Sequence, residues 1–363
     1  MMGKHRRIAT FSYLSLGLLA VLILSALSYR AIRQHQNALA LAIHTPNGVE
    51  EAFFVRIGGI DQFVQIRGED RSNPVILILH GGPGDDLVAF TPIFRAWEQP
   101  FTIVQWGQRG AGKTYGRNGK HEGELTINRM TNDGIEVAEY LRTRLHKDKI
   151  ILLGDSWGTI LGIQMVKRRP DLFFAYVGTG QIVDTRNREA ILYSALLDKV
   201  RGAHDVDGIR KLESIGPPPY KTYADLGVQR AVSGRYAVES DRGYRALVEP
   251  IVLFAPNYSL ADIYDLANAW RFSGPRLYKE FEAYDATKLG LKFDIPVFFF
   301  EGERDTITPA ELAEQYLQSI DAPAKGFVVL QNAGHFAIFT QANVFLKELV
   351  SRVRPLATLR PFG

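Results

Sequence analysis

Short apolar segments of the chain alternate with helix-like segments, and this alternation limits the possible folds more than any other feature. Strands are predicted over 53–57, 62–66, 75–79, 102–106, 150–153, 175–178, 297–300 and 327–330. Helices are predicted over 127–145, 159–168, 310–319 and 337–353. Strands and helices that alternate in this way predict a mostly parallel sheet with helices on both faces.

The stretch 181–291 breaks this alternation. It contains helix-like segments, three consecutive prolines at 217–219 and many aromatic residues. A structureless loop of this length is implausible in a compact domain. We therefore expect a helical cap, inserted between two parts of the core at 49–180 and 292–355, with a short tail over 356–363.

The first 30 residues have the pattern of a membrane anchor. Lys4, Arg6 and Arg7 precede an uncharged segment, 8–29. About 20 mostly apolar residues suffice for a helix that spans a bilayer. Basic residues before the span predict that residues 1–30 form a cytoplasmic end and a transmembrane helix, with the rest of the chain outside the cytoplasm.

A tether is expected over 31–48, between this helix and the core. A cleaved signal peptide is the alternative for the N-terminal segment, because ALS at 26–28 and ALA at 38–40 are small-x-small sequences that a signal peptidase accepts. Cleavage would give a secreted or periplasmic protein. Both alternatives place the body of the protein outside the cytoplasm.

The charge distribution argues against a body that binds nucleic acid. The chain has 43 Lys and Arg against 39 Asp and Glu, but five of the basic residues and none of the acidic ones precede Glu50. The rest of the chain is therefore nearly neutral, whereas nucleic-acid-binding domains concentrate basic charge. The chain contains no cysteine, which leaves no disulfide, thiolate metal site or cysteine nucleophile.

The sequence GDSWG at 154–158 follows a predicted strand and precedes a predicted helix. Its two glycines allow a sharp strand-to-helix turn that exposes Ser156. The amide of Trp157, at the start of the helix, can then face an oxyanion. Ser156 is the candidate nucleophile, and a serine that only caps the helix is the structural alternative.

The sequence HGGPG at 80–84 follows another predicted strand. Three glycines let the backbone come close to a ligand, and Pro83 fixes the turn. We expect the N–H of Gly82 to be the second donor to an oxyanion. We also expect His80 and Gly81 to lie at the substrate site.

Two further candidates, Asp305 and His335, each follow one of the last two predicted strands. Carboxyl ends of strands are where open α/β sheets build their sites, so both side chains are expected near Ser156. His335 would accept the serine proton, and Asp305 would hold the imidazole in place. Such a Ser-Asp-His triad predicts a serine hydrolase that acts through an acyl-enzyme. The nearby alternatives to Asp305 are Glu301, Glu303 and Asp294.

The sequence GQRGAGKT at 107–114 matches the phosphate-binding pattern G-x-x-x-x-G-K-[ST] of nucleotide hydrolases. That function requires a helix that begins at the Gly-Lys-Thr and binds phosphate with its first amides. Residues 115–120 are typical of a loop and make a poor first helical turn. The sequence therefore favours the serine hydrolase over the nucleotide hydrolase.

Together these motifs resemble the proline iminopeptidase branch of the α/β-hydrolases, over roughly residues 50–350. The resemblance rests on HGGPG at 80–84, WGQRGAG at 106–112, GDSWGT at 154–159 and the loops of Asp305 and His335. It implies an α/β-hydrolase fold with an eight-stranded sheet and an inserted helical cap. It also implies release of an N-terminal residue, often proline, from short peptides, with neither metal ion nor cofactor. By this resemblance Ser156, Asp305 and His335 are catalytic, and Gly82 and Trp157 form the oxyanion hole.

The chain departs from the family at two places that concern the substrate. Gly107 stands where the family usually has an aspartate. Peptidase members bind the substrate's amino group with cap glutamates, for which Glu249 is the candidate here, with a solvated helix glutamate as its alternative. The other functions considered are an ester hydrolase with an apolar acyl pocket and a non-catalytic binding protein on the same fold. A free carboxylate in the pocket favours the peptidase, and a wholly apolar pocket favours the esterase.

Overall fold

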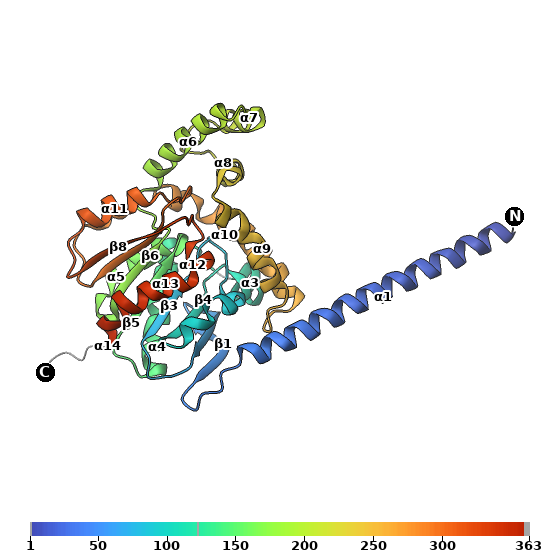
Figure 1. The fold of residues 1–363 in the computed structure, drawn as a ribbon, viewed down its shortest axis with the longest axis horizontal. Helices are drawn as coiled ribbons and strands as arrows, with labels where there is room; N and C mark the ends of the chain where they lie inside the picture. Colours follow the sequence, from blue (N-terminus) through green and yellow to red (C-terminus); the bar gives the residue numbers. More distant parts are fainter. Residues whose placement is uncertain (1, 122, 359–363) are drawn as a thin grey trace.

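The computed structural model describes residues 2–121 and 123–358, and one eight-stranded sheet forms the centre of the body (Figure 1). The strands are β1 (Val49–Ile57), β2 (Ile60–Gly68), β3 (Val75–Leu79), β4 (Thr102–Gly107), β5 (Ile150–Asp155), β6 (Phe173–Thr179), β7 (Val297–Gly302) and β8 (Lys325–Leu330). Their order in the sheet is β1-β2-β4-β3-β5-β6-β7-β8. Only the β1–β2 and β2–β4 pairs are antiparallel. The predicted, mostly parallel eight-stranded sheet is confirmed.

Alternate residues of each central strand pack on opposite faces of the sheet. In β3, Val75, Leu77 and Leu79 join one buried cluster, whereas Ile76 and Ile78 join the other. The first cluster includes residues of α4 (Ile127–Leu145), α5 (Trp157–Arg168) and α11 (Ala310–Ser319). The second includes residues of α2 (Thr91–Phe94), α12 (Ala337–Thr340) and α13 (Ala342–Glu348). The period of two along the strands therefore produces a core on each face.

The predicted helix over 337–353 is interrupted. The chain leaves helical geometry at Gln341 (φ −126°, ψ 36°), between α12 and α13. The side-chain amide of Gln341 donates to the Gln331 carbonyl (2.9 Å), which ties this break to the end of β8. A π-helical turn at Leu349–Val353 and α14 (Arg354–Thr358) then end the described chain, and residues 359–363 of the predicted tail lie outside the described residues.

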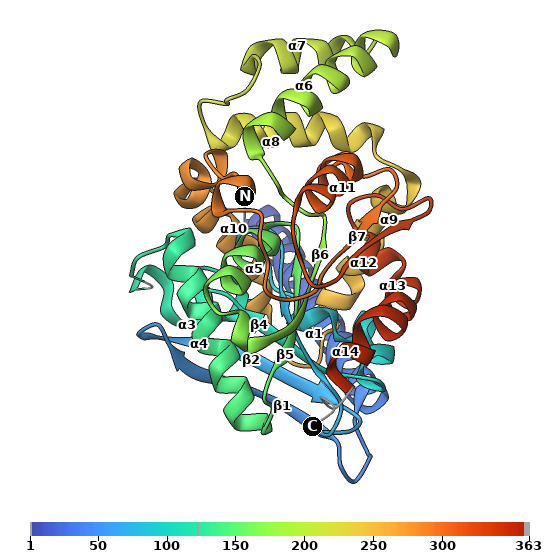
Figure 2. The ribbon, with the colours of Figure 1, turned by 90° about the vertical axis from the view of Figure 1, so that its left-hand side faces the viewer.

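Five helices occupy the stretch in which a helical cap is predicted. They are α6 (Thr185–Gly202), α7 (Val206–Ile215), α8 (Tyr223–Ser233), α9 (Glu239–Leu253) and α10 (Leu260–Glu282). Helices α6, α7 and α8 stack at one end of the molecule (Figure 2). Together with one residue of α10 they form a small core separate from the two clusters at the sheet, made of Tyr193, Leu196, Val200, Leu212, Tyr220, Leu226, Val232 and Tyr278.

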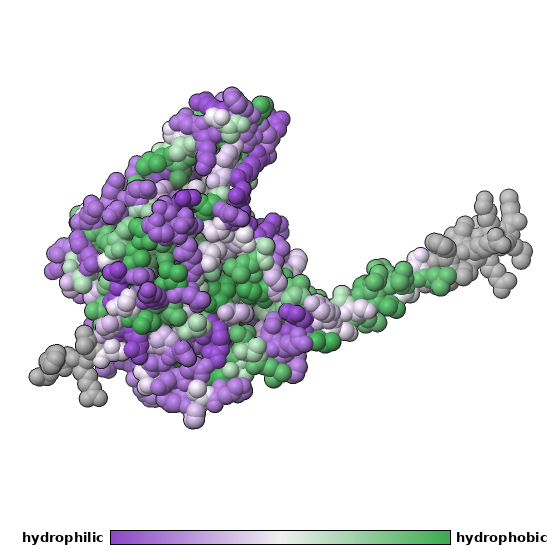
Figure 3. All heavy atoms as spheres, in the orientation of Figure 1, coloured by the Kyte–Doolittle hydropathy of each residue, from purple (hydrophilic) through white to green (hydrophobic). Residues whose placement is uncertain are grey.

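The N-terminal helix α1 (Met2–Leu41) projects from the body, and its apolar side chains from Leu14 to Leu27 are exposed (Figure 3). Among the described residues, its Leu14–Leu41 stretch is the one helix long and apolar enough to cross a membrane, a criterion that a signal sequence also meets. The helix continues to Leu41, so the tether predicted over 31–48 is wrong for most of its length.

Polar side chains on one face of α1 explain why this segment is not a tether. Arg30 donates to the Leu253 carbonyl (3.0 Å), and Asn37 donates to the Phe254 carbonyl (3.0 Å). Gln34, between them, donates to the Ala255 carbonyl (2.7 Å). Carbonyls at the end of a helix lack partners within the helix, and α1 supplies them for α9. The last turns of α1 are therefore fixed to the cap.

The WGQRG sequence at 106–110 connects several parts of the core through hydrogen bonds of Arg109. Arg109 Nε donates to Asp133 Oδ2 (2.7 Å), and its Nη2 donates to the Gly58 carbonyl (2.8 Å). Asp133 is fully buried in α4 and also accepts from Arg129 Nε (2.8 Å). The pair therefore joins the chain after β4 to α4 and to the β1–β2 turn.

Removal of the buried Asp133 carboxylate should destabilise the fold. An Asp133→Ala variant leaves the buried Arg109 guanidinium without this counter-ion, and we expect a loss of about 3–5 kcal/mol in the free energy of unfolding. Urea unfolding of the full chain measures this value. Asp171→Ala, which breaks the exposed pair with Arg169, is the matched control, with an expected change within about 0.5 kcal/mol. Equal values for the two variants would contradict this role.

Candidate active site

The site is built around a strained turn between β5 and α5. Ser156 has φ 50° and ψ −114°, a conformation that residues other than glycine rarely adopt. Such strain costs on the order of 1–3 kcal/mol and persists only where neighbouring contacts impose it. Here the Ser156 amide donates to the Thr179 carbonyl at the end of β6 (2.9 Å), which helps to hold the turn.

The two glycines of GDSWG are required by close backbone contacts. A Cβ on Gly158 would lie 2.0 Å from the Leu79 carbonyl oxygen, and a Cβ on Gly154 would lie 3.0 Å from the Gly158 oxygen. The start of α5 is therefore pressed against the end of β3. This contact sets Ser156 beside the HGGPG loop that follows β3.

The structure brings Ser156, His335 and Asp305 together in one hydrogen-bonded row. His335 Nε2 lies 3.0 Å from Ser156 Oγ, and His335 Nδ1 lies 2.8 Å from Asp305 Oδ2. The Asp305 carboxylate accepts from the amides of Ile307 (2.7 Å) and Thr308 (2.8 Å). The row is arranged so that the imidazole can accept the serine proton while its other nitrogen donates to the carboxylate.

The electrostatics of the pair suit this arrangement. Burial lowers the pKa of His335, but the charge and hydrogen bond of Asp305 outweigh it and raise the pKa above its usual value. Burial raises the pKa of Asp305, but the charge and hydrogen bond of His335 outweigh it and lower the pKa. The carboxylate therefore remains ionised beside the imidazole at neutral pH.

The alternatives to Asp305 have other partners. Glu301 is buried and accepts from the amides of Gly180 (2.9 Å) and Gln181 (3.1 Å). Glu303 accepts from the Asn332 amide (2.9 Å), and Asp294 lies 3.9 Å from Lys292 Nζ.

Two residues that the sequence did not single out support the histidine. Thr308 Oγ1 donates to Asp305 Oδ2 (2.7 Å) and lies 3.1 Å from His335 Nδ1. Asp241, from cap helix α9, accepts from the amide of His335 (2.8 Å). Nothing in the local sequence of Asp241 indicates this contact, because it joins segments 94 residues apart.

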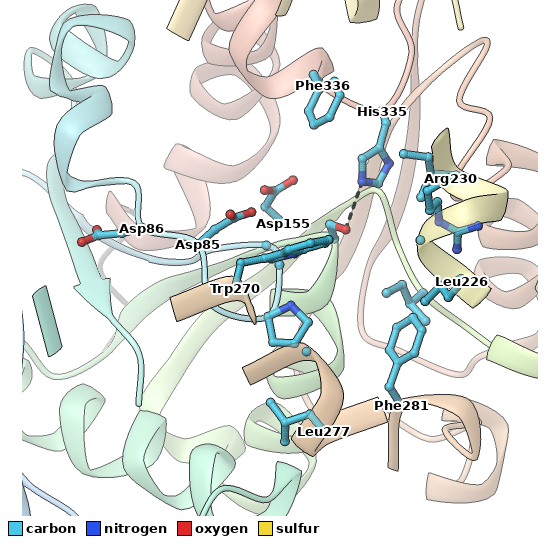
Figure 4. Close-up of a pocket in the computed structure, with 18 of the residues that line it drawn as sticks. Asp85, Asp86, Asp155, Leu226, Arg230, Trp270, Leu277, Phe281, His335 and Phe336 are labelled. Atoms are coloured by element: carbon cyan, nitrogen blue, oxygen red, sulfur yellow. Dashed lines mark hydrogen bonds between the residues drawn. The ribbon is translucent and has the colours of Figure 1, made fainter. Parts of the chain in front are cut away.

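The hydrogen-bonded row of Ser156, His335 and Asp305 lies beside a cavity of about 370 Å³ between the sheet and the cap (Figure 4). Much of its wall is apolar and is formed by Leu226, Trp270, Leu277, Phe281 and Phe336. Three aspartates, Asp85, Asp86 and Asp155, and two arginines, Arg188 and Arg230, also line it. The size lies near the lower end of the roughly 300–1,000 Å³ typical of small-molecule sites, so the cavity suits a small substrate.

The HGGPG loop contributes its glycines to the cavity but not its histidine. Gly81 and Gly82 line the cavity. His80 is buried behind the loop, where its Nε2 accepts from the Gln108 amide (3.2 Å) and its carbonyl accepts from the Gln108 side chain (3.0 Å). Burial also lowers the pKa of His80, which keeps it neutral. The prediction that His80 binds substrate is wrong: it supports the loop.

Glu249 lies outside the cavity. It is exposed on α9 and pairs with Arg245 (3.1 Å) on the same helix. The prediction that it binds the substrate's amino group is wrong, and the structural alternative of a solvated helix glutamate holds.

Carboxylates at the cavity come from the core, at Asp85 and Asp155 among others, whereas the sequence predicted one from the cap. Asp85 follows the HGGPG loop, is exposed to the cavity and accepts no hydrogen bond from the described residues. Desolvation by the surrounding protein raises the pKa of Asp85. Burial, partly offset by the positive charge of His335, raises the pKa of Asp155 to about 7. Asp85 directly follows the HGGPG motif, and Asp155 lies within the GDSWG motif. Their positions in the sequence could therefore have indicated that both lie at the site.

The sequence GKT at 112–114 does begin a helix, α3 (Gly112–Asn118), contrary to the expected loop. Its first turn nevertheless faces a carboxylate, because a Cβ on Gly112 would lie 2.1 Å from Asp86 Oδ2. Lys113 Nζ pairs with Asp262 (2.8 Å), and Thr114 Oγ1 donates to the Gly107 carbonyl (2.6 Å). The argument from a loop is therefore wrong, but an aspartate side chain lies where a phosphate would contact the first turn, and this independently disfavours nucleotide binding.

Trp157, the other residue proposed for the oxyanion hole, is the first residue of α5. The first amides of a helix have no partner within the helix and attract negative charge.

Among the described residues, no three His, Asp or Glu side chains are grouped closely enough to hold a metal ion.

The sequence pattern of the alpha/beta hydrolase fold family matches residues 74–342. The probable aminopeptidase YbaC of Bacillus subtilis is 32% identical over 308 residues, which are 82% of this chain and 94% of that protein. The proline iminopeptidase of Saccharolobus solfataricus is 25% identical over 320 residues, which are 85% of this chain and 94% of that protein. Among solved structures, a proline iminopeptidase-related protein of Thermus thermophilus has a TM-score of 0.60 at 20% identity, and the match covers 85% of this chain and 99% of that one.

The fold, the sequence motifs and these relatives all indicate the same family. The resemblance to the proline iminopeptidase branch is confirmed by these relatives, and the chain belongs to the α/β-hydrolase family.

Proposed function

We propose that this hydrolase is a serine aminopeptidase that releases the N-terminal residue of short peptides. The observation that carries the proposal is the row from Ser156 through His335 to Asp305, with spacings of 3.0 and 2.8 Å. The full-length similarity to a probable aminopeptidase supports the peptide substrate.

In the proposed reaction His335 carries the proton, and Asp305 holds the imidazole in place. Ser156 Oγ attacks the carbonyl carbon of the first residue while His335 Nε2 accepts the serine proton, and the amides of Gly82 and Trp157 stabilise the oxyanion. His335 then gives the proton to the leaving amine as the C–N bond breaks, which leaves an acyl-enzyme. Water attacks the acyl ester, His335 takes its proton, and the free amino acid leaves as Ser156 is reprotonated.

Two of the aspartates that line the cavity, Asp85 and Asp155, favour an aminopeptidase over an esterase. A substrate with a free N-terminus carries an ammonium group close to the bond that is cleaved. Asp85 and Asp155 lie on the same side of His335 in Figure 4, the charge of His335 acts on both, and Asp85 is free to accept from this ammonium. An ester with an apolar acyl chain would leave both of these polar side chains without a partner in the cavity, at a cost in desolvation. The apolar part of the wall, formed by Trp270, Leu277 and Phe281, suits the side chain of the first residue.

We also propose that α1 anchors the protein in a membrane, with the hydrolase outside the cytoplasm. The exposed apolar surface of Leu14–Leu41 supports an anchor. Contacts of Arg30, Gln34 and Asn37 with the cap argue against cleavage after residue 40, which would cut these side chains off from the body; cleavage after residue 28 would leave the contacts in place.

Loss of the Ser156 hydroxyl tests the central step. Ser156→Ala should lower kcat for Pro-β-naphthylamide by at least about 10⁴-fold, because no acyl-enzyme can form. Turnover by the full chain in detergent micelles measures this, with p-nitrophenyl acyl esters as the comparison substrate. Ser214→Ala, on the exposed face of α7, is the control. Undiminished amide cleavage in Ser156→Ala would rule out this nucleophile, and Ser156-dependent cleavage of esters alone would make the protein an esterase.

The raised pKa of His335 predicts the acid limb of the pH profile. The imidazole must be neutral to accept the serine proton, so kcat/KM should fall as the pH drops through a midpoint above the usual 6.5. Asp305→Asn removes the charge that raises this pKa. The midpoint should then move to lower pH, and kcat should fall about 10⁴-fold because the imidazole loses its orientation. An unmoved midpoint in Asp305→Asn would contradict the proposed pairing.

The ammonium site can be tested at Asp85. Asp85→Asn should lower kcat/KM for Pro-β-naphthylamide about 10- to 100-fold relative to kcat/KM for p-nitrophenyl acetate, which has no ammonium. Asp198→Asn, an exposed position on cap helix α6, is the matched control. If the ratio of the two substrates is the same in Asp85→Asn and the unchanged protein, Asp85 does not bind the amino group.

A further inference from the structure

The cap places a buried cationic cluster at the cavity that the proposed reaction does not use. Arg188 of α6 and Arg230 of α8 share one carboxylate, that of Glu189. Arg188 Nη2 donates to Glu189 Oε1 (2.7 Å), and Arg230 Nη1 donates to Glu189 Oε2 (3.0 Å). Arg188 and Glu189 are almost fully buried, and both arginines line the cavity.

The cluster carries more positive charge than its partner neutralises. Two guanidinium groups face one carboxylate, which leaves an excess of one positive charge in a desolvated place. Arg188 Nε is buried and has no hydrogen-bond partner among the described residues. The charge of Asp305 also acts on both arginines, but its carboxylate accepts hydrogen bonds from His335 and Thr308 rather than from either guanidinium. An unpaired buried donor and an unneutralised charge are costly unless a ligand completes them.

The cluster and the aspartates lie on opposite sides of the reacting row. In Figure 4, Asp85 and Asp155 lie on one side of the hydrogen bond of His335, and Arg230 lies on the other. A substrate that extends across the cavity would therefore meet negative charge at one end and positive charge at the other. The cavity of about 370 Å³ limits this substrate to a small molecule.

We propose that Arg188 and Arg230 form a subsite for the C-terminal carboxylate of the substrate, which makes free short peptides, rather than peptide amides or the ends of long chains, the preferred substrates. The inference rests on the proposed aminopeptidase function. A single carboxylate matches the single excess charge, and guanidinium groups bind carboxylates through paired N–H donors. A free dipeptide or tripeptide carries both required charges: an ammonium for the aspartates and a carboxylate for the arginines.

The test compares two probes that differ only in this charge, Pro-Ala and Pro-Ala amide. With the full chain in detergent micelles, kcat/KM for Pro-Ala should exceed that for Pro-Ala amide by about 10- to 100-fold. In Arg230→Gln this ratio should fall toward one, and Arg230→Lys should restore part of it. Arg235→Gln, an exposed cap arginine that pairs with Asp205 and Asp207 outside the cavity, should keep the full ratio. A ratio near one in the unchanged protein, or the same ratio in Arg230→Gln and Arg235→Gln, would overturn the subsite.

Binding separates this inference from the function on which it rests. Calorimetry with the Ser156→Ala chain measures the affinity for the same two probes without turnover. Tighter binding of Pro-Ala than of its amide, lost in the Ser156→Ala, Arg230→Gln double variant, would support the subsite even if cleavage of Pro-β-naphthylamide failed. Cleavage of Pro-β-naphthylamide together with equal affinities for the two probes would leave the aminopeptidase intact and overturn the subsite.

Discussion

The contact between the start of α5 and the end of β3 is the constraint on which the site depends. A side chain at Gly158 would collide with the Leu79 carbonyl, so only glycine allows the helix to begin this close to the strand. The contact holds Ser156 in its strained conformation and brings it beside the HGGPG loop. Because β5 lies between β3 and β6 in the sheet, the turn stands at the centre of the edge where the other loops converge.

The cap covers the cavity and also contributes charged side chains to its wall. The core supplies Ser156, His335 and the aspartates Asp85 and Asp155, whereas cap helices α6 and α8 supply Arg188 and Arg230. Cap helix α9 also supports the site from outside, through Asp241 at the backbone of His335 and through Tyr244, which stacks on Phe336 at 3.9 Å. The same helix is bonded at its C-terminal end to α1. Contacts of α9 therefore connect α1 to the cap and the cap to the loop that bears His335.

The sequence predicted the features that depend on local pattern. The strand over 75–79 was predicted at its observed bounds, and the helices over 127–145 and 310–319 were as well, because their hydrophobic periods and end signals are strong. The meeting of Ser156, Asp305 and His335 followed from their order and from their places after strands. These placements need no knowledge of distant contacts beyond the topology of the sheet.

The features that were missed or wrong depend on contacts between distant segments. Residues 31–41 lack a strong local signal, and their helix is fixed by carbonyls more than 200 residues away. Glu249 matched a family pattern loosely, but the face of α9 that bears it points away from the cavity, where it pairs with Arg245. Arg188 and Arg230 look like ordinary helix arginines until the fold of the cap buries them against Glu189.

The central claim is that the row makes Ser156 nucleophilic, and covalent labelling tests it most directly. The full chain would be treated with a fluorophosphonate, which reacts with activated serines, and then analysed by intact mass and peptide mapping. One phosphonyl group on Ser156, with labelling lost in His335→Ala, is the predicted result. An unlabelled Ser156, or equally fast labelling of His335→Ala, would contradict the account.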